Sequence, residues 1–322
     1  MRSQKREFIE IGNKVYKVKS DNNERLIIKK SGFEREEYES YQKIKEYLHI
    51  PKVKLIKEKE KPKTLVVEQI KDLTIKSAFI HDIINAEIGF QDFIGDLRKM
   101  WMKTVQPMEE KRLARNIRLD SIETLKDFLS NSLSQEIINL SLKVNNDLYP
   151  TLKDTCTSVL RKLSENKDPI MVLGHGDEHL RNLFLNKDKK SERKYWVIDP
   201  RSAGFYSPAH AINNLIGGAH LFFYEYAQKI NQTENTISII YEILPEYQKA
   251  KIIIDKNFKL LIESLQNLSK EPFLLKEYLF ANLIRSYIKR VNPKRIDEIY
   301  KNSQSHLATA NELYYKDYVN LF

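Results

Sequence analysis

Short apolar runs of strand length alternate with turn signals from Glu7 to Ile70. FIEI and KVYKV flank a turn at Gly12 and Asn13, and the polar cluster SDNNE leads into RLIIKK. Such runs, rich in β-branched and aromatic residues and bounded by Gly, Asn and Asp, are typical of strands. We therefore expect three short antiparallel strands at the start of the chain.

A helical period then interrupts the strand pattern. In FEREEYESYQKIKEYL, apolar side chains recur at near-helical spacing (Phe33, Tyr41, Ile44 and Leu48) behind a glutamate-rich first turn, which the helix dipole favours. Pro51 ends this helix, and VKLIKE and TLVVEQI predict two more strands. The pattern indicates a small antiparallel sheet with one helix inserted after its third strand.

Longer helical patterns dominate after Lys71. We expect helices over about 75–101, 119–144 and 149–163, and only helices from Pro208 to the end. Apolar, β-rich runs interrupt them at IMVLGHG, NLFLN and KYWVID, which we predict to be strands. The pattern predicts an α+β fold in two parts, and 322 residues suit two units of roughly 150 residues each.

Composition excludes several classes of protein. Hydrophobic residues at 41% and charged residues at 30% are typical of globular proteins. No apolar run approaches the roughly 20 residues that span a bilayer, and MRSQKREFIE lacks the apolar core of a secretory signal, so we expect a cytoplasmic protein without a membrane span. The single cysteine, Cys156, excludes an internal disulfide and a zinc cluster of thiolates.

The net charge of +10 raises the possibility of a nucleic-acid partner. The excess is spread thinly, however, and the densest stretch, 52–63, alternates cations with glutamates and apolar residues. This is typical of a solvated surface, so the sequence disfavours nucleic-acid binding.

Polar side chains follow the apolar runs of the second part. Asp177 and Asn182 lie in GHGDEHLRNLFL, and Asp199 follows the run YWVI. Loops at strand ends can direct such groups into one cleft. Phosphoryl transfer needs a carboxylate that accepts or orients the proton of the acceptor hydroxyl, and hard oxygen ligands for Mg²⁺. Asp177 can serve as the base, and Asn182 with Asp199 can hold the metal.

The segment His175 to Asp199 resembles a known family. His-Gly-Asp-x-x-x-x-Asn, followed by a strand and Ile-Asp, is similar to the motif of the aminoglycoside phosphotransferase and choline kinase group, which are relatives of protein kinases. The resemblance implies a bilobal protein-kinase-like fold, with a nucleotide-binding N-terminal lobe at 1–71 and a helical C-terminal lobe at 72–322. It implies ATP or GTP as donor, Mg²⁺ as cofactor, and as acceptor a small molecule such as a sugar, amino alcohol or antibiotic. Oligomeric state is left open.

Carried over residue by residue, the resemblance makes Asp177 the catalytic base. Asn182 and Asp199 become the magnesium ligands, and His175 becomes a brace for the loop. His179 matches the form His-Gly-Asp-x-His, and it either lies near the acceptor or packs the loop.

The strand RLIIKK resembles the family's third strand. We assign Lys29 as the lysine that holds the α- and β-phosphates; Lys30 is the alternative, since successive strand side chains point to opposite faces. Among the glutamates of the following helix we choose Glu37 as its partner, because Tyr41 and Ile44 follow at i+4 and i+7.

The remaining nucleotide contacts are assigned by position. The hinge that receives the nucleotide base corresponds to Glu68, Gln69 and Ile70, and the loop over the phosphates to Gly12 and Asn13. The Gly-x-Gly-x-x-Gly of protein kinases is absent.

Two features depart from the family pattern. Glu178 follows the catalytic aspartate, where the family usually has an apolar residue. Ser207, Ala211 and Asn213 stand where an aspartate often anchors the catalytic loop. These departures motivate an alternative reading, a kinase-fold binding module without turnover. Another alternative is a metal-dependent hydrolase, because His175, Asp177 and His179 have a spacing that can chelate a transition metal.

The acceptor is only weakly constrained. A polycationic aminoglycoside requires a carboxylate-rich pocket, whereas the helices after Pro208 carry acids and bases in similar numbers. No activation segment of protein-kinase length separates Asp199 from the helix near Pro208, which favours a small molecule over a protein hydroxyl. Arg201 can pair with a phosphate, an acidic acceptor or a structural partner.

Overall fold

The computed structural model describes a defined part of the chain: residues 8–12, 15–19, 25–29, 33–56, 64–130, 135–188, 190–200, 202–224, 228–241, 243, 245–269, 271–290, 306–307 and 309–315. The chain divides into two compact units, residues 1–104 with 173–204, and residues 105–172 with 205–322. This division follows compactness, and the lobe boundary after Lys71 stays a prediction.

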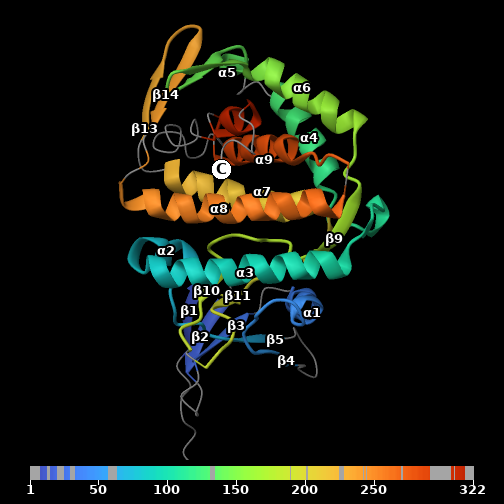
Figure 1. Cartoon of the computed structure of the whole chain (residues 1–322), viewed down its shortest axis with the longest axis vertical. Helices are drawn as coiled ribbons and strands as arrows, with labels where there is room; N and C mark the ends of the chain where they lie inside the picture. Colours follow the sequence, from blue (N-terminus) through green and yellow to red (C-terminus); the bar gives the residue numbers. More distant parts are fainter. Residues whose placement is uncertain are drawn as a thin grey trace, which may run out of the picture. The chain divides into compact units, whose positions relative to one another are not determined.

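The first unit contains a five-stranded sheet in the order β1-β2-β3-β5-β4, with all neighbours antiparallel (Figure 1). Its strands are β1 (Phe8–Gly12), β2 (Val15–Lys19), β3 (Arg25–Lys29), β4 (Val53–Ile56) and β5 (Thr64–Glu68). Helix α1 (Glu34–Ile44) connects β3 to β4. The predicted sheet with one inserted helix is therefore confirmed.

One face of α1 packs on this sheet and is buried. Glu37, Ser40, Tyr41 and Ile44 are its inward residues, at the i, i+3, i+4, i+7 spacing of a helix stripe. The Tyr41 ring lies in a core with residues of β5. The buried face is unusual because three of its residues, Glu34, Glu37 and Ser40, are polar, and the last two contact the site.

The rest of the first unit is a helical pair and a hairpin. Helices α2 (Ile75–His81) and α3 (Ile83–Thr104) confirm the helix expected over 75–101, with a break at Asp82. Strands β10 (Leu183–Leu185) and β11 (Tyr195–Val197) form an antiparallel hairpin that contacts α2 and α3 (Figure 1). The hairpin positions the segments on either side of it, which carry the candidate catalytic residues.

The second unit is mainly helical. Helix α4 packs against α6 and α9, and α7 packs against α8 and α9. The elements are β6 (Gln106–Pro107), the 3₁₀ helix η1 (Glu110–Arg112), α4 (Ile117–Ser130), α5 (Gln135–Ile138), β7 (Ser141–Val144), β8 (Asp147–Thr151), α6 (Leu152–Glu165), β9 (Ile170–Gly174), β12 (Gly204–Tyr206), α7 (Pro208–Tyr224), β13 (Gln228–Gln232), β14 (Thr236–Tyr241), α8 (Pro245–Leu268) and α9 (Leu275–Arg290). Residues 309–315 are also helical. In the described ranges no helix is both long and apolar enough to cross a membrane.

The structure corrects the prediction in a second sheet, of order β13-β14-β7-β8. We expected helix up to Val144 and from Tyr149, and helices alone after Pro208; these expectations are wrong here. Strands β7 and β8 form a hairpin around a two-residue turn in which Asn145 has a φ of 54°, a conformation that Asn tolerates.

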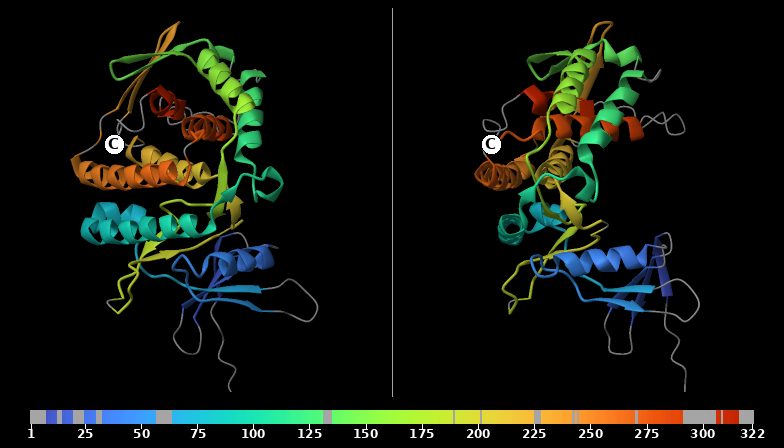
Figure 2. Two further views of the ribbon diagram at one scale, coloured as in Figure 1. Left: turned by 45° about the vertical axis from the view of Figure 1, so that its right-hand side comes forward. Right: turned by 90° about the vertical axis from the view of Figure 1, so that its right-hand side faces the viewer.

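Strand β14 pairs with β7 in parallel although the two lie far apart in sequence (Figure 2). Ile237 and Ile239 are buried while Ile240 is exposed, which is the two-residue period of a strand with one covered face. The sequence contains both the Asn-Asn turn between β7 and β8 and the alternation in β14. The apolar runs around them also fit a helical period, which is why we predicted helices there.

Helix α3 approaches the hairpin so closely that one position requires glycine. A Cβ at Gly89 would lie 2.7 Å from the carbonyl oxygen of Lys194, whereas a Cβ at Gly95 on the same helix would meet nothing within 4 Å. We predict that Gly89→Ala lowers the free energy of unfolding by about 1–3 kcal/mol through overpacking. Gly95→Ala should raise it by about 0.5–1 kcal/mol through helix propensity. Urea unfolding of both variants measures the difference, and equal effects would contradict this packing.

Candidate active site

The Lys29 side chain lies between two carboxylates of the first unit. Its Nζ donates to Glu37 Oε1 at 2.6 Å and is also bonded to Oδ1 of Asp199. Burial alone would lower the pKa of Lys29, but the charges of Asp199 and Glu37 outweigh it and raise that pKa above its usual value. The ammonium is therefore charged, and it joins β3, α1 and the segment after β11. Lys30 lies outside the described residues.

Polar groups of α1 hold the backbone that follows β11. The Tyr41 hydroxyl accepts a hydrogen bond from the Asp199 N–H at 3.0 Å, and Ser40 Oγ accepts one from the Ala203 N–H at 3.1 Å. Lys43 Nζ donates to the Ala203 carbonyl at 3.0 Å. Sequence reasoning missed these positioning residues; the available signal was a tyrosine and a serine on the buried stripe of a helix.

Asp199 has an uncommon backbone conformation. Its φ is 56°, in the left-handed region that non-glycine residues rarely occupy and that Asp tolerates better than most. Such strain persists where the surroundings impose it, and here the Tyr41 bond to the backbone and the Lys29 bond to the side chain both do so.

His175 connects the loop after β9 to the segment before Asp199. Its Nε2 donates to the Ile198 carbonyl at 2.9 Å, and its Nδ1 accepts from the Asp177 N–H at 3.2 Å. Burial lowers the pKa of His175, so the ring is neutral with its proton on Nε2. Gly176 follows with a φ of 90°, which a side chain would strain.

Asp177 is held by two neighbours in its own loop. His179 Nε2 lies 3.2 Å from Asp177 Oδ1, and Asn182 Nδ2 donates to Oδ2 at 3.1 Å. Burial would raise the pKa of Asp177, but the bonds from His179 and Asn182 outweigh it and lower that pKa below its usual value. The carboxylate is therefore ionised and oriented.

Asn182 and Asp199 occupy the same end of the β10–β11 hairpin. Leu183 pairs with Val197, and the Asn182 carbonyl accepts from the Ile198 N–H at 3.0 Å. The hairpin register thus brings together the amide and the carboxylate that the motif assigned to the metal.

Glu178 braces the loop that carries Asp177 from inside. Its side chain is buried, and Oε1 accepts from the N–H groups of His175 at 2.8 Å and Gly176 at 3.3 Å. A carboxylate that accepts backbone N–H bonds fixes the loop's conformation. The departure from the family pattern is therefore a structural contact in this chain.

The structure describes only some of the residues that the sequence assigned to the base and phosphates of the nucleotide. Glu68 ends β5 and is bonded to Lys52 through its N–H at 2.9 Å and its carboxylate at 3.3 Å. Gln69 and Ile70 follow as irregular backbone. Gly12 ends β1 opposite Val15. Asn13 and Arg201 lie outside the described residues.

The donor set suits a hard cation. Asp199 and Asn182 offer carboxylate and amide oxygens, which Mg²⁺ prefers together with water and substrate phosphates. Both nitrogens of His175 are already hydrogen-bonded, so it is not free to bind a transition metal with Asp177 and His179. In the described part of the chain no three His, Cys, Asp or Glu side chains are arranged to hold an ion by themselves.

Solved structures with the same fold span nearly the whole chain. A thermostable mutant of aminoglycoside phosphotransferase APH(4)-Ia, in ternary complex with AMP-PNP and hygromycin B, aligns with a TM-score of 0.57 at 11% identity, covering 97% of this chain and 95% of that one. The GDP complex of wild-type aminoglycoside 2'-phosphotransferase-IIIa aligns with a TM-score of 0.51 at 11% identity, covering 99% and 94%. Choline kinase from Cryptosporidium parvum Iowa II aligns with a TM-score of 0.50 at 12% identity, covering 96% and 88%.

Sequence comparison alone finds less. No protein-family model matches the chain, and no curated protein matches it in sequence. The structural similarities show that this chain has the fold of aminoglycoside phosphotransferases and choline kinases, as the motif predicted. The protein-kinase-like α+β fold class is confirmed.

The buried neutral His175 predicts a pH dependence of stability. Because its pKa is lowered in the folded chain, the unfolded chain binds a proton first as the pH falls below about 6.5. The free energy of unfolding should then fall by up to about 1.4 kcal/mol per pH unit, and the fall should be smaller in His175→Gln. Urea unfolding between pH 7 and pH 5 measures the slopes.

The control for this comparison is His81→Gln, which alters an exposed histidine at the end of α2. It should keep the slope of the unaltered protein. A slope that His175→Gln leaves unchanged would contradict the buried neutral state of this ring.

Proposed function

We propose that this protein transfers the γ-phosphate of a magnesium-bound nucleotide to a hydroxyl of a small molecule. The observation that carries the proposal is the position of the Lys29 ammonium between Glu37 and Asp199. These residues come from three separate segments, and the sequence alone assigned Asp199 to the metal through the motif, and Lys29 and Glu37 to the nucleotide through the resemblance of their strand and helix. An incidental surface ion pair would give no reason for three residues with these assignments to meet.

The nucleotide would bind through the first unit. The similar structures contain GDP in one case and AMP-PNP in another, which supports a purine nucleotide here without choosing between ATP and GTP. Nucleotide phosphates would replace Asp199 as a partner of Lys29, while Glu37 keeps the lysine oriented. The base would lie at Glu68, Gln69 and Ile70.

The replaced Asp199 carboxylate, together with the Asn182 amide oxygen, would hold Mg²⁺. When bound, the ion offsets negative charge on the phosphates. The fit rests on the oxygen donors and on the hairpin register that places both residues at one end. The loop over the phosphates would correspond to Gly12 and Asn13.

Asp177 would accept the proton of the acceptor hydroxyl as that oxygen attacks the γ-phosphate. The bonds from His179 and Asn182 keep the carboxylate ionised and aimed, which a base needs before the substrate binds. His179 then acts by positioning Asp177, and His175 by holding the loop against Ile198.

The two alternatives have less support. A binding module without turnover would not need to retain a base, a lysine, its glutamate and the metal ligands together. The absence of an acid at Ser207, Ala211 and Asn213 is weaker support for an inactive protein than it was from sequence. Glu178 braces the loop that carries Asp177 in its place. The hydrolase reading conflicts with the two hydrogen bonds that occupy His175.

Phosphate transfer from Mg–ATP or Mg–GTP to a panel of sugars, amino alcohols and antibiotics tests the proposal. Asp177→Asn should lower turnover by about 10²–10⁴-fold, because the amide cannot accept the proton. Its dissociation constant for Mg–nucleotide should stay within about threefold of the original, since Asp177 is not assigned a nucleotide contact.

Asp188→Asn is a matched control in the loop between β10 and β11, where Asp188 is exposed. It should leave turnover unchanged. A panel that is never phosphorylated by a protein that binds nucleotide would favour the binding module, and transfer that survives Asp177→Asn would refute the role of this residue.

A further inference from the structure

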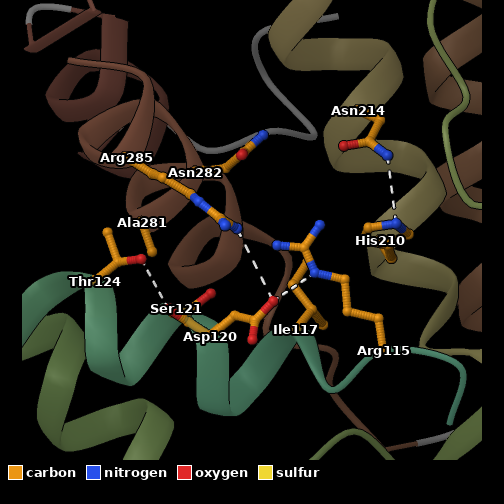
Figure 3. Close-up of a pocket in the computed structure, with 10 residues that line it drawn as sticks. All are labelled: Arg115, Ile117, Asp120, Ser121, Thr124, His210, Asn214, Ala281, Asn282 and Arg285. Carbon is orange, nitrogen blue, oxygen red and sulfur yellow. Dashed lines mark hydrogen bonds and ion pairs between the residues drawn. The ribbon is translucent and has the colours of Figure 1, made fainter. Parts of the chain in front are cut away.

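A polar cleft lies inside the second unit, between α4, α7 and α9 (Figure 3). Its cavity volume is about 30 Å³, which suits one small charged group rather than a whole ligand. Arg115 precedes α4, Asp120 lies in its first turn, His210 and Asn214 come from α7, and Asn282 and Arg285 come from α9. None of these residues is used in the proposed phosphate transfer.

The charges around this cleft are unbalanced. Arg115 Nε is bonded to Asp120 Oδ2, and Arg285 Nη1 lies 3.9 Å from the same oxygen. Asp120 is thus one carboxylate facing two guanidinium groups. Lys289 follows Arg285 on α9, and burial, then Arg285 and Arg115, lower the pKa of its ammonium. Among the described residues here, the cations outnumber the carboxylate.

Hydrogen-bond donors in the cleft remain available. One terminal nitrogen of Arg115 points toward the Arg285 guanidinium, and the other points into the space between Asn282 and Asn214 (Figure 3). Among the described residues, no hydrogen-bond partner lies against those nitrogens or against the side-chain amide of Asn282. Asn214 lies 3.4 Å from His210 Nε2 and completes the polar wall on α7.

We propose that this cleft binds an anionic group, a phosphate or a carboxylate, of a small molecule. A guanidinium presents paired N–H donors that match the oxygens of such groups, and an anion would relieve the mutual repulsion of Arg115, Arg285 and Lys289. The net positive wall is unsuited to a polycationic ligand such as an aminoglycoside.

The anion has two sources that share this chemistry. It belongs either to the hydroxyl-bearing acceptor, in which case this inference rests on the proposed function, or to a separate small anion. Binding of inorganic phosphate needs neither nucleotide nor turnover. Failure of the anion site is therefore distinguishable from failure of the phosphotransferase proposal.

Calorimetric titration of the full chain with inorganic phosphate tests the site. Arg285→Gln should weaken binding by roughly tenfold or more, the usual effect of removing one charged donor. Lys259→Gln removes the same charge from an exposed position on α8 and should leave binding unchanged. If Arg285→Gln does not fold, Lys289→Gln, which breaks no ion pair with a described residue, provides the second variant.

Absence of phosphate binding, or equal binding by the cleft variants and the Lys259 control, would overturn the proposal. Equal binding would place the phosphate elsewhere, for example at the nucleotide site. Once binding is found, KM values for phosphate-bearing and phosphate-free acceptors identify the source. A KM raised by Arg285→Gln only for phosphate-bearing acceptors assigns the anion to the acceptor, and unchanged KM values assign it to a separate ligand.

Discussion

The contact of one ammonium with two carboxylates organises the first unit. Lys29 is partly buried, and each of its partners is as well, so any of the three charges alone would be costly in this position. Together they require β3, α1 and the segment after β11 to meet in one arrangement. Removing Lys29 would leave two partly buried carboxylates without compensation, so this cluster ties α1 to β3 and to the segment after β11.

The same helix sets the backbone of the proposed metal ligand. Tyr41 contributes a ring to the core and a hydroxyl to the Asp199 N–H, so packing and site geometry are coupled through one side chain. On the other side, His175 links Ile198 to the loop that carries Asp177, and Glu178 closes that loop on itself. The braces of Asp177 and Asp199 therefore come from within the first unit.

Much of this was predictable because it depends on local pattern. Strand alternation located the five-stranded sheet, and the spacing of Tyr41 and Ile44 behind Glu37 selected the glutamate that the structure places 2.6 Å from Lys29. The motif assigned Asn182 and Asp199 to one metal site, and the hairpin register places both residues at the same end of the β10–β11 hairpin.

Other features depend on contacts between distant residues and could not be predicted. Glu178 is a charged residue in a polar loop, and nothing nearby in sequence shows that it is buried against backbone N–H groups. The β14 strand forms by pairing with β7, which lies nearly a hundred residues earlier, so its short apolar run was assigned to a helix. The unbalanced charges at Arg115, Arg285 and Lys289 likewise meet only after α4 and α9 pack.

We propose above all that the Lys29 and Asp199 pair is a nucleotide and magnesium site. Calorimetric titration with ATP and with GTP, with and without Mg²⁺, tests it on the unaltered chain, on Asp199→Ala and on Asp188→Ala as a control. We expect Mg²⁺ to strengthen binding by about tenfold or more in the unaltered and control proteins, and this dependence to be lost in Asp199→Ala. No binding of either nucleotide, or a magnesium dependence that survives in Asp199→Ala, would contradict it.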